Sequence, residues 1–205
     1  MPPIERFLIY LVAGWSGYYV MAIELLSGRI LAPNFGNSIY VWGGIITVFM
    51  MALSVGYLAG GQFSTRAPNR AKLGGLLLAA ALATLPVVTF GNAVLDALFE
   101  RVHDPRYASL LASTTLFFVP TAISGMVSPY AVRLLATSLS ATGRSAGSLY
   151  FVSTFGSAAG TILTSFYMVL WFEIDQIFVG MMAASAVIGG VAILTPARAP
   201  AHVSG

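Results

Sequence analysis

Long apolar runs separated by short polar segments dominate the chain. Each run is close to the roughly 20 apolar residues that a helix needs to cross about 30 Å of hydrocarbon. The runs are Phe7 to Val20, Ile39 to Leu58, Leu73 to Phe90, Leu110 to Met126, Tyr150 to Phe172 and Ile177 to Leu194. No ten-residue alternating pattern typical of a membrane barrel is present, so helices satisfy the backbone in lipid. We predict transmembrane helices over residues 7–28, 39–62, 72–93, 108–130, 146–171 and 176–194.

The polar segments between these helices are too short to form a second, water-soluble core. Of the 205 residues, 58% are hydrophobic and only 8% are charged, which agrees with an all-α integral membrane protein. Because only Arg6 precedes the first run and no clear small-x-small site follows it, we expect this run to stay as a helix and not to be a signal peptide. The sequence therefore predicts one transmembrane domain over residues 1–205.

The cations predict the orientation in the membrane. If the helices alternate in direction, seven cations fall at one end of the bundle and three at the other. The seven are Arg6, Arg66, Arg70, Lys72, Arg133, Arg144 and Arg198, and the three are Arg29, Arg101 and Arg106. The positive-inside rule then places both termini in the cytoplasm. The net charge of +3 is explained by this orientation, so we expect the lipid bilayer and not nucleic acid as a partner.

Residue types that carry catalysis are scarce. The chain has no cysteine, which excludes disulfides, thiolate catalysis and cysteine-based metal sites. His103 and His202 are the only histidines, and neither has a second imidazole at ligand spacing. No nucleophile elbow, Walker loop or dinucleotide-binding glycine pattern occurs. We therefore expect no metal site, no cofactor and no enzymatic activity of the chain alone.

Small residues recur at helical spacing in the second and fifth predicted helices. One stripe holds Gly56 and Gly60, and another holds Gly156, Gly160 and Thr164. A parallel row of hydroxyls consists of Ser153, Ser157 and Thr161. Small residues let helix backbones approach closely in membranes. We expect these stripes to mark packing within the bundle, with a dimer face or a hydroxyl-lined polar cavity as the alternatives.

Glu24 is the only acidic residue inside a predicted membrane helix, where a charge is costly enough to indicate function. The functional interpretation is that Glu24, with Tyr18, Tyr19 and Arg29 nearby, lines an outward-facing polar cavity that receives a cationic amine. The structural alternative is that Glu24 reaches the interface or pairs with Arg29.

Three stretches resemble the membrane region of bacterial proteins in which a membrane domain is fused to, or encoded with, a spermidine synthase-like domain. They are MAIELLSGRILAPNFGNSIYVWG at residues 21–43, ISGMVSPYAVRL at 123–134 and GRSAGSLYFVSTFGSAAGT at 143–161. The resemblance extends from about Gly14 to Phe166. It implies a helical membrane domain similar to half of a major-facilitator fold, in the bacterial inner membrane. The segment GGQFSTRAPNRAK at 60–72 also resembles the loop between the second and third helices of major-facilitator transporters, although Thr65 replaces its Asp.

The resemblance further implies a partner. In that family the catalytic domain transfers an aminopropyl group to a polyamine, and the chain, ending at Gly205, has no room for such a domain after its last helix. We expect a separate soluble aminopropyltransferase-like or methyltransferase-like subunit to dock on the cytoplasmic face.

Three functions remain open at this stage. The first is a non-catalytic membrane subunit or anchor for such an enzyme. The second is a small-solute transporter, with amines as the candidate substrate class, formed by two copies as a homo-oligomer. The third is a structural subunit of a larger membrane complex that contacts other membrane subunits.

Overall fold

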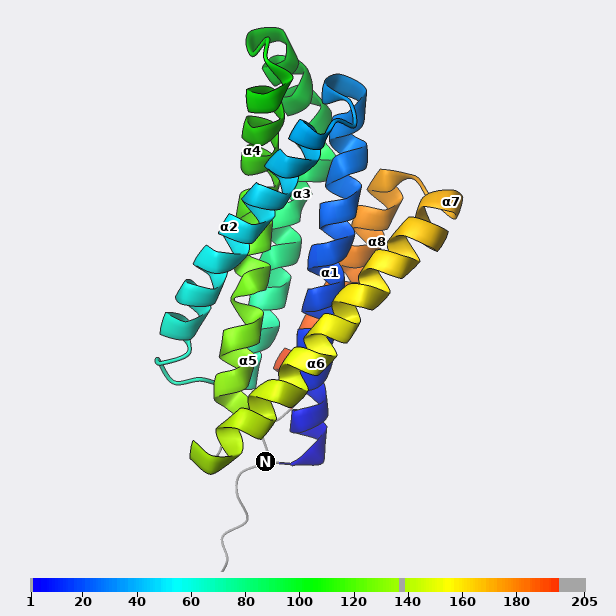
Figure 1. Ribbon diagram of the computed structural model, residues 1–205. Helices are drawn as coiled ribbons and strands as arrows, with labels where there is room; N and C mark the ends of the chain where they lie inside the picture. Colours follow the sequence, from blue (N-terminus) through cyan, green and yellow to red (C-terminus); the bar gives the residue numbers. More distant parts are fainter. Residues whose placement is uncertain (1, 137–138, 196–205) are drawn as a thin grey trace, which may run out of the picture.

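The computed structural model describes residues 2–136 and 139–195, without the side chains of 139–142, and every regular element in these ranges is a helix (Figure 1). The elements are α1 (Pro3–Phe35), α2 (Ile39–Phe63), α3 (Arg70–Arg101), α4 (Pro105–Gly125), α5 (Val127–Leu135), α6 (Leu139–Leu163), the π-helix η1 (Thr164–Met168), α7 (Val169–Trp171) and α8 (Ile174–Leu194). They form six helical spans that are long and apolar enough to cross a membrane. The predicted helical class and the six spans are confirmed.

Several helices extend beyond their predicted ends. The first span continues to Phe35 instead of residue 28, and the third continues to Arg101 instead of residue 93. The apolar run marks only the part of a helix that fits the hydrocarbon, whereas the helix itself continues until a cap or a breaking residue ends it. Gly36 ends α1 with a φ of 78°, a backbone conformation that glycine adopts without strain. Asn69 begins α3, because its side chain accepts a hydrogen bond from the Lys72 amide at 2.8 Å.

The sequence predicted one uninterrupted helix for each of the fourth and fifth spans. The structure shows an interruption in both. The fourth is divided at Met126 into α4 and α5, three residues before Pro129. Proline has no amide hydrogen, so Pro129 cannot make the helical hydrogen bond to the carbonyl of Gly125. The fifth span changes from α6 to the π-helix η1 at the fully buried Thr164. Such π-helical turns are rare and occur often at functional sites.

Glycines bring the six spans together in three closely packed pairs. In the pair of α1 and α6, a Cβ added at Gly160 would lie 2.9 Å from the Cα of Tyr18. In the pair of α2 and α4, a Cβ at Gly56 would lie 3.0 Å from the Cα of Gly125. Such distances leave no room for a side chain. The third pair joins α3 and α8 through Gly74 and Gly189.

The other small residues of the two stripes also lie inside the bundle. A Cβ at Gly60 would lie 2.6 Å from the Cα of Met126, and a Cβ at Gly156 would lie 3.1 Å from the Cα of Gly14. These contacts are all within the chain, so the glycine stripes serve the packing of its own helices.

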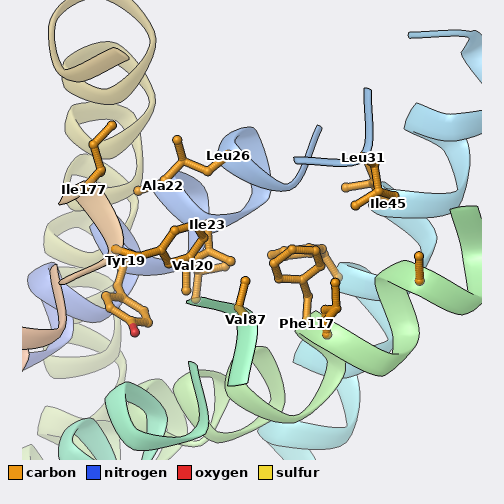
Figure 2. Packing of buried hydrophobic residues seen from close by; sticks show 14 of the residues in the cluster. Tyr19, Val20, Ala22, Ile23, Leu26, Leu31, Ile45, Val87, Phe117 and Ile177 are labelled. Carbon is orange, nitrogen blue, oxygen red and sulfur yellow. The ribbon is translucent and has the colours of Figure 1, made fainter. Parts of the chain in front are cut away.

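Helix α1 lies at the centre of the bundle, and α6 runs obliquely across it (Figure 1). Side chains from α1, α3, α4 and α8 meet around it in the larger of two apolar clusters (Figure 2). Tyr19 belongs to this cluster, and its hydroxyl donates to Thr84 Oγ1 at 2.9 Å, so that α1 is joined to α3 in the core. A second cluster around Ile9, Leu77 and Tyr130 fills the other half of the bundle.

One end of the bundle brings the starts of α1 and α3 together with the end of α8. The Arg70 guanidinium lies 3.7 Å from the Glu5 carboxylate and donates to the carbonyls of Ala192 and Thr195. The start of α1 and the end of α8 therefore lie at the same end of the bundle, as six spans of alternating direction require. Of the seven cations assigned to this end, Arg198 lies outside the described residues, as does His202.

Candidate functional site

Two adjoining cavities lie between α1, α2, the break from α4 to α5, and α6. Their volumes are about 90 Å³ and about 300 Å³, and they share Tyr57, Ser128, Ser153 and Ser157 as lining residues. We call them together the hydroxyl groove, because eight side chains that line it carry a hydroxyl. The eight are Ser16, Tyr57, Ser124, Ser128, Tyr150, Ser153, Thr154 and Ser157.

The break between α4 and α5 shapes one wall of the groove. Ser124, Gly125 and Ser128 line the smaller cavity, and Pro129 lines the larger one. The Ser16 hydroxyl donates to the carbonyl of Ser124 at 3.1 Å and so holds α1 against this break. Ser124 at the end of α4 and Ser128 at the start of α5 both line the smaller cavity.

Two of the eight groove hydroxyls have already donated their protons within the described chain and are available to a ligand only as hydrogen-bond acceptors. The protons of Ser16 and Ser157 are already donated to backbone carbonyls, in the second case to that of Ser153 at 3.1 Å. The oxygen lone pairs of these two side chains remain free for another donor. Ser124 is only 2% exposed, and within residues 2–136 and 139–195 its hydroxyl has no hydrogen-bond partner. A buried polar group without a partner costs free energy, so each such case calls for an explanation.

Glu24 lies on the face of α1 that lines the groove, one turn farther along the helix. Val20 and Met21 line the smaller cavity, and Glu24 follows them by four and three residues. Residues at these spacings occupy the same helix face. Glu24 is half-buried, and its carboxylate makes no ion pair or hydrogen bond with the part of the chain that the structure describes.

The four residues expected to form one cavity point in different directions. The Tyr18 hydroxyl donates to the Met168 sulfur at 3.3 Å, and that of Tyr19 donates to Thr84 on α3. The exposed Arg29 forms no ion pair with Glu24, so the structural pairing is not observed either. Each residue advances about 100° around a helix, so five residues separate the directions of Glu24 and Arg29 by about 140°. The structure does not bring Glu24, Tyr18, Tyr19 and Arg29 together in one cavity, and a binding role for Glu24 stays a prediction.

Arg29 lines a different cavity, at the opposite end of the bundle from Arg70. This cavity of about 350 Å³ lies between α1, α3 and the connection from α7 to α8, and its polar lining residues are Arg29, Asn92, Glu173 and Asp175. It is open to the surroundings, and Arg29, Glu173 and Asp175 are all exposed. A mixed set of exposed charges is ordinary at the end of a membrane helix bundle.

Sequence reasoning missed most of the groove. It singled out Ser153 and Ser157 but not Ser16, Tyr57 or Ser124. The Ser-xxx-Ser spacing of residues 124 and 128 next to Pro129 was a usable signal, because proline marks an interruption close to both serines. The remaining residues come from other helices, and only their packing brings them together.

Comparisons with known proteins do not assign the chain to a family. No protein-family model, no curated protein and no solved structure matches it. In the described ranges, no three His, Cys, Asp or Glu side chains lie close enough to hold a metal ion. The resemblance to spermidine synthase-like membrane domains thus remains an inference from the sequence.

Proposed function

We propose that the chain is one six-helix unit of a membrane assembly that binds a small polar solute in the hydroxyl groove and conducts it across the membrane. The observation that carries this proposal is the unpartnered, buried hydroxyl of Ser124 in a polar groove between the helices of a membrane bundle, where the described part of the chain gives it no partner. Water is absent from hydrocarbon, so polar groups there are costly unless they have partners. A bound solute provides such partners.

A second copy of the chain completes the groove in this proposal. Only 17% of the most apolar 18-residue window in the span Gly143–Trp171 is buried, compared with 56% in α1. This span supplies Tyr150, Ser153, Thr154 and Ser157 to the groove. Hydroxyls beside an uncovered helix face favour another protein unit over lipid as the neighbour.

The pairing of the helices supports the comparison with half of a major-facilitator fold. If the first three spans are exchanged with the last three, the pair of the first and fifth spans becomes the pair of the fourth and second. The pair of the third and sixth spans is unchanged. A unit of three spans begins on one side of the membrane and ends on the other, so its second copy has the opposite orientation. This pattern is typical of an inverted repeat, and transporter sites lie near the midplane where such repeats meet.

Cysteine cross-linking tests the assembly without background, because the natural chain has no cysteine. Thr154→Cys on the groove side of α6 is expected to give a cross-linked dimer in membranes. The matched control is Val187→Cys on α8, which is 66% exposed and does not line the groove. Equal cross-linking of both variants, or of neither, contradicts a specific dimer at this face.

Solute flux tests the proposed activity itself. The full chain, reconstituted in liposomes, is expected to release entrapped small polar solutes faster than empty liposomes do. Ser124→Ala removes the hydroxyl without adding bulk at this buried position, so it is expected to slow the release. Identical release from protein-containing and empty liposomes contradicts transport by this chain.

A second candidate is an anchor for a soluble enzyme, which the sequence resemblance implies. One structural observation favours it: the segment between α2 and α3 is held in place at the cytoplasmic end of the predicted topology. The amide of Asn69 donates to the Tyr130 hydroxyl at 3.0 Å, and Lys72 Nζ donates to the carbonyl of Arg66 at 2.7 Å. Beside it lies a hollow of about 510 Å³ lined by Gln62, Thr65 and Arg66 among others. A fixed basic surface of this kind suits docking of a partner.

Purification after mild detergent extraction separates the candidates. A soluble aminopropyltransferase-like or methyltransferase-like subunit in the complex supports the anchor. Other membrane proteins in the complex support a structural subunit, and the chain with only its own copies supports the transporter.

A further inference from the structure

Resting on the proposed function, the geometry points to an organic ammonium ion as the class of solute, and we infer that Glu24 provides its counter-charge while the groove hydroxyls accept its hydrogen bonds. The inference stands on three observations. These are the hydrogen-bond acceptors that the groove offers, the position of the Glu24 carboxylate, and the apolar side chains that line the smaller cavity.

The hydrogen-bonding groups in the groove match a donor. The lone pairs of Ser16 and Ser157 are free because both protons are bound to carbonyls, and the Ser124 hydroxyl is unpartnered in the described part of the chain. Pro129 also leaves the Gly125 carbonyl without its usual helical donor. An ammonium group has three N–H donors and no acceptor, so it complements this set.

Charge selects the same class. The described residues that line the groove include no Lys or Arg, so no cation is present to bind an anionic solute. Glu24 lies on the groove face of α1, about 6 Å along the helix axis from Val20. A cation in the groove gives this carboxylate the partner that the protein itself does not supply, and ionisable groups within membranes almost always have one.

The apolar residues of the groove favour an organic cation over a hard metal ion. Val20, Met21 and Leu53 line the smaller cavity together with its serines. These side chains are not ligands for hard cations such as Mg²⁺ or Ca²⁺, which need oxygen atoms, but they contact the carbon chain of an alkylammonium ion favourably. The larger cavity, about 300 Å³, also has room for several carbon atoms.

Binding to the purified full chain in detergent tests the inference. Titration calorimetry compares three probes of nearly equal size: butylammonium, butan-1-ol and butyrate. We expect saturable binding of butylammonium and much weaker binding of the other two. Glu24→Gln keeps the shape of the side chain but removes its charge, so it is expected to weaken butylammonium binding by about tenfold or more. Ser124→Ala is expected to weaken it by a smaller factor.

Matched variants keep the test specific. Asp175→Asn removes an exposed carboxylate in the cavity that Arg29 lines, and Ser54→Ala removes an exposed hydroxyl that donates to its own helix at Met50. Both are expected to bind butylammonium as the natural chain does. Glu24→Asp keeps the charge and is expected to retain binding, and thermal melting without ligand shows whether each variant is folded. If Glu24→Gln does not fold, retained binding by Glu24→Asp together with loss in Ser124→Ala supports the site, and unchanged binding in Ser124→Ala overturns it.

The outcomes separate this inference from the proposed function. Equal binding of butan-1-ol or butyrate overturns the ammonium class but leaves solute binding in place. An equal loss of butylammonium binding in Asp175→Asn and Glu24→Gln also overturns it, because the cavity that Arg29 lines then contributes as much to binding as the groove does. Absence of binding for all three probes, together with absence of flux, overturns both.

Discussion

The Nε–H of Arg70 donates a hydrogen bond to the carbonyl of Ala192 at 2.8 Å, so the first residue of α3 caps the last turn of α8. The same guanidinium donates to the carbonyl of Thr195 and lies 3.7 Å from Glu5 at the start of α1. Carbonyls in the last turn of a helix have no partner within the helix and carry partial negative charge, so a cation suits this position. One side chain thereby joins three helices at the end of the bundle where the described chain begins and ends.

Replacing Arg70 with alanine is expected to destabilise the fold. It leaves the carbonyls of Ala192 and Thr195 without their donor, and hydrogen bonds to a charged group contribute about 1.5–3 kcal/mol. Thermal melting in detergent measures the loss. Arg133→Ala removes an exposed arginine from the same end and is the control. Equal melting temperatures for the two variants would show that the Arg70 contacts do not stabilise the protein.

Gly160→Leu is expected to separate α6 from α1. Because a Cβ at this position would lie 2.9 Å from the Cα of Tyr18, a leucine forces the two backbones apart, at a cost of about 1–3 kcal/mol. The control is Gly180→Leu on α8, where no atom lies within 4 Å of an added Cβ. Folded yield and melting temperature in detergent are the measurements. Normal values for both variants would contradict close packing at Gly160.

Both termini are expected on the cytoplasmic side, with residues 101–106 on the other. The prediction combines six spans with the greater number of cations at the end that contains Arg70. Reporter fusions at Ser204 and within the loop at His103 test it in bacterial cells. A periplasmic signal from the fusion at Ser204 would show that the orientation is reversed or the number of spans is wrong.

Acid is expected to loosen the start of α4. The Arg106 side chain donates to the Asp104 carboxylate at 2.7 Å and the Arg106 amide donates to it at 3.0 Å, and these bonds lower the pKa of Asp104 below its ordinary value. A carboxyl whose pKa is lower in the folded state stabilises the fold above its unfolded pKa, and this contribution is lost as the pH falls through the folded pKa.

Hydrogen exchange at residues 104–108 measures this effect. After correction for the intrinsic dependence of exchange on pH, protection of these amides is expected to decrease on acidification through the range below about pH 4. Asp104→Asn has no carboxyl to titrate there, so its protection is expected to change little over the same range. A decrease of equal size in this variant would assign the effect to another group.

The sequence by itself determined the helical class and the number of spans. A run such as Ile39 to Leu58 is long enough to cross hydrocarbon, and in lipid only a helix satisfies every backbone group of such a run. The close approach of Gly56 and Gly160 to neighbouring helices was also predictable, since small residues at helical spacing let helix backbones approach closely in a membrane. These features depend on composition and local period alone.

Only the tertiary structure decided which residues share the groove. Glu24 and Arg29 are near each other in the sequence, but the turn of the helix separates them by about 140°, so Arg29 lines another cavity. Ser16, Ser124 and Ser157 are far apart in the sequence and come from three spans, yet they line one cavity. How each of those spans is rotated about its own axis is set by the close backbone contacts at glycines and by the interruption at Met126. Such contacts join distant parts of the chain, and a local pattern of residues carries no record of them.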